Sequence, residues 1–459
     1  MRFFDKFTGN LPQIYRVPYG DKIFRFEDNT VVILFNGQKS LNQENDVVCV
    51  SENETHRLQA VTKPQFAYNP TRECKFGSFI IICNVVPTLK TFYLTKNIGN
   101  KQLAKIRVRT PHLARSPVVV CFSPLFYFEN WRLLLTSLEI YKYYGANLQV
   151  VYVQSMLSSL FALLQVYEKN KDVAIESWQS HDLTKDLISK IGYDPNLELD
   201  WRNQAASHTD CLLKYKEAAD FIIINDLDDV LVPKLASTLL AEFNLLSNKF
   251  PSAAGFSYYR FNVAIKDDFT VDSFSFSKLL KSAKISKQKE NQKYVLKTNK
   301  ALTAWLHWPG IVLPGYEMFI VPEKNFMLHL RNWTKDISTN NKDMNPTQLE
   351  KFISSNDQVM IENDFQNRIA STLEFKNLPT LEIYSKLIVK CYDEIFYSKK
   401  RQPNKCPGPN LCSFKSQPGI HCTAAKKALT TRYVTKKLRI TTAAEDASFI
   451  TYKNGCSMK

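Results

Sequence analysis

Long apolar runs are absent from this chain of 459 residues. A helix that spans a membrane needs about 20 consecutive apolar residues, and no stretch of the sequence comes near that length. The start of the chain, Met1 to Lys6, also lacks the apolar core of a signal peptide. We therefore expect any attachment to a membrane to depend on an anchor that is not present in this sequence.

Two further absences argue against a structural zinc site and against binding of nucleic acid. No Cys-x-x-Cys pair occurs among the ten cysteines, which argues against a structural zinc site. The net charge is +16, but the seven lysines between 281 and 300 are mixed with polar residues and a single aromatic, Tyr294. This pattern is typical of a solvated loop, and no module that binds nucleic acid is visible. We expect no nucleic-acid partner.

The cysteines that are present suggest an oxidising compartment. Half of them lie after residue 385, in segments rich in Pro and Gly that can bury little, and disulfides are the expected support there. Cys121 and Cys211 fall in a predicted strand and a predicted helix, where we expect buried thiols. The triplets Asn53-Glu-Thr55 and Asn332-Trp-Thr334 match the pattern for N-glycosylation. Together these features favour a glycoprotein of the secretory lumen.

Composition divides the chain into three parts. Residues 1–115 contain strand-like runs with little helical periodicity, which predicts a β-rich N-terminal module. Residues 116–385 alternate strand and helix patterns and are the expected catalytic domain. Residues 386–459 are expected to form a basic, cysteine-rich C-terminal extension. With 44% hydrophobic residues, the chain can bury a large core.

The middle part predicts an α/β fold. Buried strands are indicated at 118–122, 148–152 and 173–175, and helical spacing of apolar residues at 129–144, 157–167 and 201–219. Alternation of strands and helices predicts a doubly wound parallel sheet.

An apolar run, Phe221 to Ile224, is followed by a cluster of carboxylates. The run is typical of a strand buried on both faces. Asp226 and Asp228 stand two residues apart, so they point the same way in extended backbone, and Asp229 follows. Ligands of open α/β sheets bind at the carboxyl ends of strands. The cluster predicts a site for Mg²⁺ or Mn²⁺ shared with a substrate phosphate; acids that only cap a turn are the structural alternative.

Two classes of enzyme place an Asp-x-Asp pair after such a strand. In a haloacid-dehalogenase-like phosphotransferase, Asp226 is the nucleophile and Asp228 the general acid. In a nucleotide-sugar glycosyltransferase, the pair binds a metal. The position of the pair in the middle of the chain, after alternating strands and helices, favours the glycosyltransferase.

The same region resembles glycosyltransferase family 92, in its nematode-type branch. The matching segments lie within residues 115–335 and include 122–127, 138–146, 176–178, 201–206, 209–216, 226–233 and 321–324. The resemblance implies a glycosyltransferase A fold and transfer of a hexose with inversion, with UDP-galactose as the donor. It also implies a glycan or glycoprotein acceptor and a location in the Golgi lumen. A catalytically inactive relative that binds glycans is the alternative within the family.

Five side chains are candidates for binding the donor. Glu129 and Trp131 lie in the first turn of a helix that follows a strand, where a nucleotide base or ribose can rest. Asn203 and Asp210 lie on the helix before the aspartate cluster, and Asp226 is expected to reach the ribose or the metal.

The expected ligands of Mn²⁺ or Mg²⁺ are Asp226, Asp228 and Asp229, together with one histidine. His329 follows the segment that resembles the family's closing motif. Its neutral imidazole is a suitable further ligand.

Inversion requires a base that removes the proton of the acceptor hydroxyl. Glu317 is the first candidate by its order in the chain, followed by Asp336, with Asp267 and Asp268 as rivals. Glu317 also marks a departure from the family, in which a Lys often stands shortly before the Pro-Glu pair.

Overall fold

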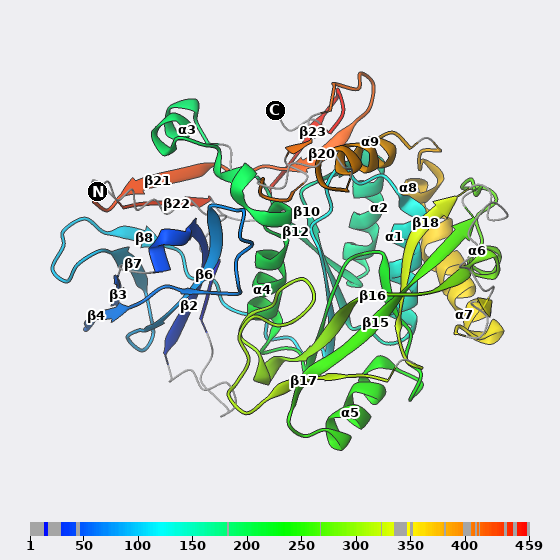
Figure 1. Cartoon of the computed structure of the whole chain (residues 1–459), viewed down its shortest axis with the longest axis horizontal. Helices are drawn as coiled ribbons and strands as arrows, with labels where there is room; N and C mark the ends of the chain where they lie inside the picture. The colour runs from blue at the N-terminus through cyan, green and yellow to red at the C-terminus, as the bar shows by residue number, and fades with distance from the viewer. Residues whose placement is uncertain are drawn as a thin grey trace.

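The computed structural model describes residues 13–16, 29–42, 46–180, 183–266, 268–322, 324–334, 347–348, 352–380, 382–397, 405–408, 411–412, 414–435, 438–443 and 448–456. These residues form a mixed α/β structure with one large sheet at its centre (Figure 1). A β-rich part made by the N-terminal residues lies to one side of this sheet, and strands of the C-terminal extension pack against both parts.

The central sheet has ten strands, all parallel in its first half and mixed in its second half. Its path begins with four parallel strands, β12 (Val173–Ser177), β10 (Leu148–Val153), β9 (Val118–Phe122) and β13 (Phe221–Asn225). It continues with β16 (Lys284–Lys297), β15 (Ala253–Lys266), β18 (Met327–Thr334) and β14 (Asp229–Leu231), while β17 (Glu317–Ile320) pairs with β15 and β19 (Thr347–Gln348) with β16. β16 runs antiparallel to both β13 and β15, whereas β15 pairs in parallel with β17 and β18. The predicted parallel sheet is therefore correct for the first half only, because β15 returns into β16 without a crossover to the far side of the sheet.

The lysine-rich stretch, predicted to be a solvated loop, forms strand β16. Its register pairs Tyr294 with Ile224 of β13 and Glu290 with Arg260 of β15. Lys293 is fully buried between these positions. The prediction was wrong because the composition of one segment does not show which strands pair with it.

Helices cover both faces of the parallel half because its strands are apolar throughout. On one face, α1 (Trp131–Tyr143) and α2 (Ser158–Lys169) share a core with Val120 of β9. On the other face, α4 (Gln204–Tyr215) shares a core with Cys121, the next residue of the same strand. This alternation follows from the two-residue period of a strand. The three helical patterns predicted before the aspartate cluster correspond to these three helices.

Further helices surround this framework. They are α3 (Lys185–Ile191), α5 (Leu239–Lys249), α6 (Phe276–Ser282), α7 (Ser355–Phe365), α8 (Leu373–Lys376) and α9 (Tyr384–Tyr392). Among the described residues, none of the helices has the length and apolar character needed to cross a membrane.

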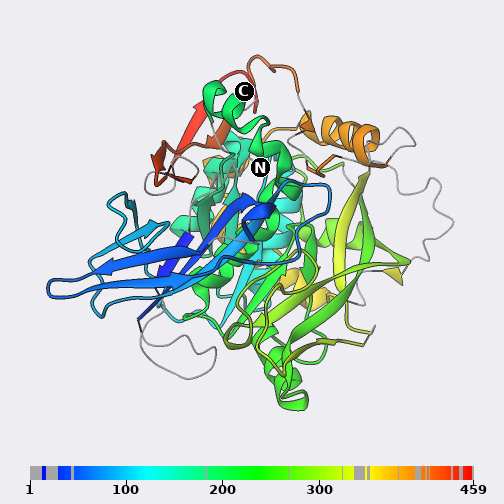
Figure 2. The ribbon, with the colours of Figure 1, turned by 60° about the vertical axis from the view of Figure 1, so that its left-hand side comes forward.

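The N-terminal part consists of two antiparallel sheets, which extend outward from the central sheet (Figure 2). The first contains β1 (Gln13–Arg16), β2 (Thr30–Gln38), β6 (Phe76–Asn84) and β5 (Gln65–Phe66). The second contains β4 (Arg57–Thr62), β3 (Val47–Glu52), β7 (Thr91–Thr95) and β8 (Ala104–Ile106). Val32 and Ile80 of the first sheet lie in the same apolar cluster as Leu212 of α4. The N-terminal strands thus cover the α4 side of the central sheet.

The C-terminal extension adds short strands to both parts. β20 (Cys422–Ala425) pairs with β11 (Ser155–Leu157) and with β23 (Phe449–Tyr452), beside α2. The hairpin of β21 (Leu429–Tyr433) and β22 (Arg439–Ala443) contributes to the core of the N-terminal part, through side chains that include Ile440.

Five disulfides use all ten cysteines. They are Cys49–Cys83, Cys74–Cys406, Cys121–Cys211, Cys391–Cys412 and Cys422–Cys456. The expectation of disulfides in the C-terminal extension is confirmed. The expectation of free thiols at Cys121 and Cys211 is wrong, because the helical period of α4 turns Cys211 toward the face of β9 on which Cys121 lies.

Candidate active site

The aspartate cluster lies at the carboxyl end of β13, in the turn that leads to β14. β13 ends at Asn225 and β14 begins at Asp229. The Asn225 side chain fixes the turn, because its Nδ2 donates to the backbone oxygen of Asp229 at 2.5 Å and to the hydroxyl of Tyr141 at 2.6 Å. The hydroxyl of Tyr141 also donates to the same backbone oxygen at 3.0 Å.

Three of the predicted metal ligands come together here. Asp228, Asp229 and His329 each present one ligand atom, and these atoms lie within 4.8 Å of one another. His329 reaches the turn because β14 pairs with β18 in a register that places it opposite Asp229. Two carboxylate oxygens and one imidazole nitrogen form a donor set that Mn²⁺ accepts.

A carboxylate on β16 orients the imidazole of His329. Nδ1 of His329 lies 2.6 Å from Oε2 of Glu290, and Nε2 lies 3.2 Å from Oδ2 of Asp228. Burial lowers the pKa of His329, but the hydrogen bonds to Asp228 and Glu290 outweigh burial and raise this pKa to about 10. A carboxylate on Nδ1 that leaves Nε2 directed at the ligand position is the usual arrangement around a metal-bound histidine.

Asp229 is fully buried beside a guanidinium group. Nη1 of Arg260, on β15, lies 3.0 Å and 3.2 Å from the two carboxylate oxygens of Asp229. Burial raises the pKa of Asp229 to about 6 despite the opposing charge of Arg260. Nε of Arg260 donates to the backbone oxygen of Asn291 at 2.6 Å, which ties this arginine to β16.

Asp226 has different neighbours. Its Oδ2 forms an ion pair with Nζ of Lys293 at 2.8 Å, while its Oδ1 accepts from Nε2 of Gln204 at 2.5 Å and from the hydroxyl of Ser123. Burial raises the pKa of Asp226, but the charge of Lys293 and these hydrogen bonds overcome burial and hold the pKa well below its usual range. Asp226 is not part of the group of three potential ligands. Its predicted place in the metal set stays a prediction, and in this structure its two oxygens face Lys293, Gln204 and Ser123.

Each carboxylate of the cluster is opposed by one cation from the second half of the sheet. The pairs are Asp226–Lys293, Asp229–Arg260 and Asp228–His329. Three adjacent carboxylates repel one another unless positive groups join them, and the two basic residues on β15 and β16 that do so were not identified from the sequence.

Several residues of the site were not identified from the sequence, and these residues differ in how clearly the sequence points to them. Ser123 and Gln204 lie inside segments that resemble the family, so their positions were available from the sequence. Lys293 was hidden among the other lysines of its stretch. Arg260 and Glu290 gave no local signal, because the pairing of β15 with β16 brings them to the cluster.

Two predicted donor-binding residues lie in another environment. The carboxylate of Glu129 accepts backbone N–H groups of Ile383 and Ser385, both at 2.7 Å, at the start of α9. The indole of Trp131 is 1% exposed and donates to the backbone oxygen of Pro379 at 3.0 Å. The structure does not bring either side chain to the aspartate cluster, because both are occupied in joining α1 to the segment around α9.

Asn203 and Asp210 are also engaged inside the protein. Ser78 of the N-terminal part donates to Oδ1 of Asn203 at 3.1 Å. The hydroxyl of Tyr152 donates to Oδ2 of Asp210 at 2.5 Å, and Asp210 is fully buried. These side chains fix α4 between the N-terminal strands and β10, and they do not join the cluster directly.

The structure separates the first candidate base from the cluster. Glu317 is exposed and pairs with Ala253, the first residue of β15, whereas Arg260 lies near the middle of that strand. Seven residues of strand separate Ala253 from Arg260, which corresponds to about 20 Å. Asp268 is exposed and forms an ion pair with Lys266.

Two other candidate bases, Asp336 and Asp267, lie outside the described residues. The structure does not bring Glu317 to the aspartate cluster, because the order of residues does not show how far along a strand a residue lies, and its role as the base stays a prediction.

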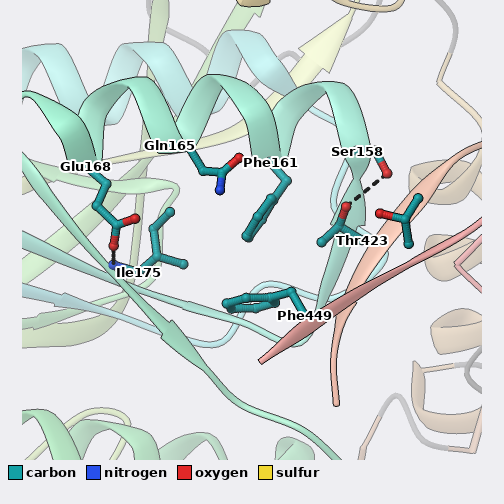
Figure 3. Close-up of a pocket in the computed structure, with 8 residues that line it drawn as sticks. Ser158, Phe161, Gln165, Glu168, Ile175, Thr423 and Phe449 are labelled. Carbon is teal, nitrogen blue, oxygen red and sulfur yellow. Dashed lines mark hydrogen bonds between the residues drawn. The ribbon is translucent and has the colours of Figure 1, made fainter. Parts of the chain in front are cut away.

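A groove of about 570 Å³ lies between α2 and the C-terminal strands (Figure 3). Phe161 and Phe449 form its apolar wall, with ring centroids 4.7 Å apart, and Ser158 bonds to Thr423 across one end at 2.9 Å. The groove shares no lining residue with the aspartate cluster, so it is a separate feature of the surface.

Comparisons with known proteins agree on one family. The profile of the family described as "Glycosyltransferase family 92" matches residues 116–369. The Caenorhabditis elegans protein "Glycosyltransferase family 92 protein F59C6.8" is 32% identical over 421 residues, which cover 87% of this chain and 79% of that protein. A second protein of the same species, "Glycosyltransferase family 92 protein C33H5.2", is 31% identical over 395 residues, or 82% of this chain and 76% of that protein.

The region that matches the family profile contains all three carboxylates of the cluster and the cations that oppose them. The resemblance noted from sequence segments is thereby confirmed, and the chain belongs to glycosyltransferase family 92.

Proposed function

We propose that this protein is a metal-dependent glycosyltransferase with a glycosyltransferase A architecture. In this proposal it transfers a hexose, with galactose from UDP-galactose as the first choice, to a glycan or glycoprotein with inversion. The observation that carries the proposal is the meeting of Asp228, Asp229 and His329 at the carboxyl end of β13. In open α/β sheets this edge is where ligands bind.

The donor set fits a hard or borderline divalent ion such as Mn²⁺ or Mg²⁺. Asp228, Asp229 and His329 would hold the ion, which would displace the proton that Nε2 of His329 carries in the absence of metal. Glu290 would keep this Nε2 directed toward the ion. Such an ion neutralises the diphosphate leaving group of a nucleotide sugar.

The cations around the cluster would assist in binding the diphosphate. Lys293 lies against Asp226 and Arg260 against Asp229, so both positive charges are held at the edge where the diphosphate is expected. This arrangement offers a substitute for the Lys that relatives often have near the position of Glu317. We assign to Asp226 the role of holding Lys293, Ser123 and Gln204 in place for the donor.

Inversion needs a carboxylate on the acceptor side, and we place Asp336 ahead of Glu317 for this role because Glu317 pairs with Ala253, well before Arg260 on β15. Asp336 is therefore the first candidate to test, with Asp267 and Asp268 as its rivals.

The five disulfides support folding in the secretory lumen, with the Golgi as the proposed site of action. A phosphotransferase in which Asp226 is the nucleophile has less support, because Lys293, Ser123 and Gln204 already bind both of its oxygens.

The central experiment is calorimetry of UDP binding to the full chain with Mn²⁺ and with EDTA. We expect UDP to bind only when the metal is present, and a thermal-shift screen of nucleotide sugars with Mn²⁺ to select UDP-galactose. Equal affinity for UDP in EDTA would contradict the proposal. Capture of beryllium fluoride, a mimic of an aspartyl phosphate, would favour the phosphotransferase instead. Glycan binding without any metal-dependent UDP binding would indicate an inactive relative.

A further inference from the structure

A hairpin that follows β16 carries an aromatic tip. Isolated bridges pair Ala301 with Val312 and Ala304 with Pro309, so the turn between them consists of residues 305–308. The indoles of Trp305 and Trp308 stack at this tip, with centroids 4.3 Å apart and planes inclined by 34°. Trp308 is 55% exposed, which is unusual for the largest apolar side chain.

Hydrogen bonds to β16 place this tip near the aspartate cluster. Nδ1 of His307 lies 2.8 Å from the backbone oxygen of Gln292. The hydroxyl of Tyr294 donates to the backbone oxygen of Trp305 at 2.5 Å and accepts from its N–H at 3.0 Å. Lys293, which pairs with Asp226, stands between these two anchoring residues. The aromatic tip and the cluster are therefore fixed to the same short stretch of strand.

The charges that act on His307 are consistent with a position of the tip near the aspartate cluster. Burial and the positive charge of Lys293 lower the pKa of His307 to about 4, while Asp226 acts in the opposite direction. The imidazole is consequently neutral near pH 7, and the tip presents an uncharged aromatic surface beside a strongly charged site.

Hydrogen bonds to α4 and to the N-terminal part fix the hairpin in place. Thr209 of α4 donates to the backbone oxygen of Ala304 at 2.9 Å and accepts from its N–H at 3.0 Å. The hydroxyl of Thr303 donates to the backbone oxygen of Ala67, in the N-terminal part, at 2.5 Å. At Gly310, any Cβ would lie 2.1 Å from that same oxygen, so only glycine allows this close approach. The N-terminal part thus helps to pre-organise the tip.

One polar atom of the tip lacks a partner in the part of the chain that the structure describes. The indole Nε1 of Trp305 is buried and donates to no acceptor there. A buried N–H without an acceptor is unfavourable, so an acceptor supplied by water or by a ligand hydroxyl stabilises this arrangement.

We propose that Trp308, supported by Trp305, stacks against a hexopyranose ring of the acceptor glycan. The apolar face of a pyranose carries C–H groups that suit the negative face of an indole. We favour the acceptor over the nucleotide base as the group that stacks on Trp308. A base or ribose binds outside the carboxyl ends of the parallel strands, whereas the hairpin follows β16, which lies on the opposite side of β13 from the other parallel strands. The assignment of the ring to an acceptor rests on the proposed function.

The test uses the full chain, a printed array of vertebrate and invertebrate N- and O-glycans, and calorimetry of UDP with Mn²⁺. We expect Trp308→Ala to weaken binding of the best array glycan about tenfold, from the loss of one stacked aromatic face. Binding of UDP should stay within about twofold of the unchanged chain. Trp308→Tyr, which restores an aromatic face, should recover most of the glycan binding.

Two control variants separate the alternatives. Leu113→Ala removes an equally exposed apolar side chain that precedes β9, at the opposite edge of the sheet, and should change neither ligand. Phe449→Ala alters the groove between α2 and β23 (Figure 3) and should leave glycan binding unchanged.

Three results would overturn the inference. They are the absence of any glycan binding by the unchanged chain, loss of UDP rather than glycan in Trp308→Ala, and loss of glycan in Phe449→Ala but not in Trp308→Ala. Failure of the proposed function would give a different result in calorimetry, because UDP would then bind without metal or would not bind at all. Glycan binding that depends on Trp308 would in that case still establish the aromatic platform.

Discussion

The ammonium group of Lys293 lies 2.8 Å from Oδ2 of Asp226, and only 1% of the lysine side chain is exposed. Removal of one partner from a buried ion pair leaves the other charge uncompensated. Asp226 keeps 30% of its side chain exposed, so the effect should be smaller than for a fully enclosed pair.

We expect Lys293→Met to lower the free energy of unfolding by about 2 kcal/mol. Urea denaturation measures this quantity. Combination with Asp226→Asn should recover part of the loss, because the double variant contains no unpaired charge. Strictly additive losses in the double variant would show that the two residues do not interact.

Asp228→Asn should abolish metal-dependent binding of UDP. Asparagine preserves the size of the side chain, so the free energy of unfolding should change by less than about 1 kcal/mol. Calorimetry with Mn²⁺ measures the binding. Asp268→Asn is the matched control, since Asp268 forms an ion pair with the exposed Lys266. This variant should bind UDP normally. Retention of metal-dependent binding in Asp228→Asn would remove this residue from the metal site.

Lys216 makes the stability of the protein depend on pH in the alkaline range. Burial lowers the pKa of its ammonium group from 10.5 to about 8. Between these values the unfolded chain holds a proton that the folded chain has lost, so stability should rise as the pH increases from 8 to 10.5. Below pH 8 the full cost of burying the charge is present, on the order of 3 kcal/mol.

Lys216→Met should therefore raise the melting temperature at pH 7 and flatten its rise toward pH 10. Scanning calorimetry across this range provides the measurement. The exposed Lys278, on α6, supplies the control Lys278→Met, which should keep the slope of the original protein. An unchanged slope in Lys216→Met would show that another group causes the pH dependence.

The Cys121–Cys211 disulfide should matter for both stability and donor binding. It joins β9 to α4, and the first residue of α4 is Gln204, which binds Asp226. Replacement of both cysteines by alanine should lower the free energy of unfolding by about 2–4 kcal/mol and weaken UDP binding.

The Cys49–Cys83 disulfide, inside the N-terminal part, gives the comparison. Its removal should also reduce stability but leave UDP affinity unchanged. Equal effects of the two double variants on UDP affinity would argue against a specific role for the link between β9 and α4.

Glu317→Gln should leave turnover within about twofold, because the β15 register places this residue far from the cluster. Asp336→Asn should reduce turnover by about 10²–10⁴ if Asp336 is the base. Steady-state assays of sugar transfer, with UDP binding as the check on folding, distinguish the two. A loss of that size in Glu317→Gln would require a large movement of β17 during catalysis.

The sequence predicted the local parts of this structure well. Apolar runs and helical spacing located β9, β10, β12 and β13 and the helices α1, α2 and α4, because both signals arise within a few residues. The aspartate cluster and His329 were identified as potential ligands for the same reason: a short carboxylate pattern after a buried strand and one histidine in a recognisable segment.

Long-range pairing was not predictable from one sequence. The partners of Asp226 and Asp229 lie on β16 and β15, and only the register between these strands brings Lys293 and Arg260 to the carboxylates. The same limitation explains the choice of Glu317. It also explains Glu129, whose acidic side chain at the start of α1 suggested a ligand but binds the backbone of a segment more than 250 residues later.

The Cys74–Cys406 disulfide determines when the N-terminal part can be completed. Its two cysteines are 332 residues apart. A ribosome adds residues one at a time from the N-terminus, so Cys74 cannot form this disulfide until the chain has been synthesised as far as Cys406. The backbone next to Cys406 is then tied down as well, since the N–H of Trp201 donates to the oxygen of Pro407 at 2.8 Å. A translation product that stops before residue 406 would therefore carry an unpaired cysteine, and this thiol would distinguish unfinished chains from finished ones.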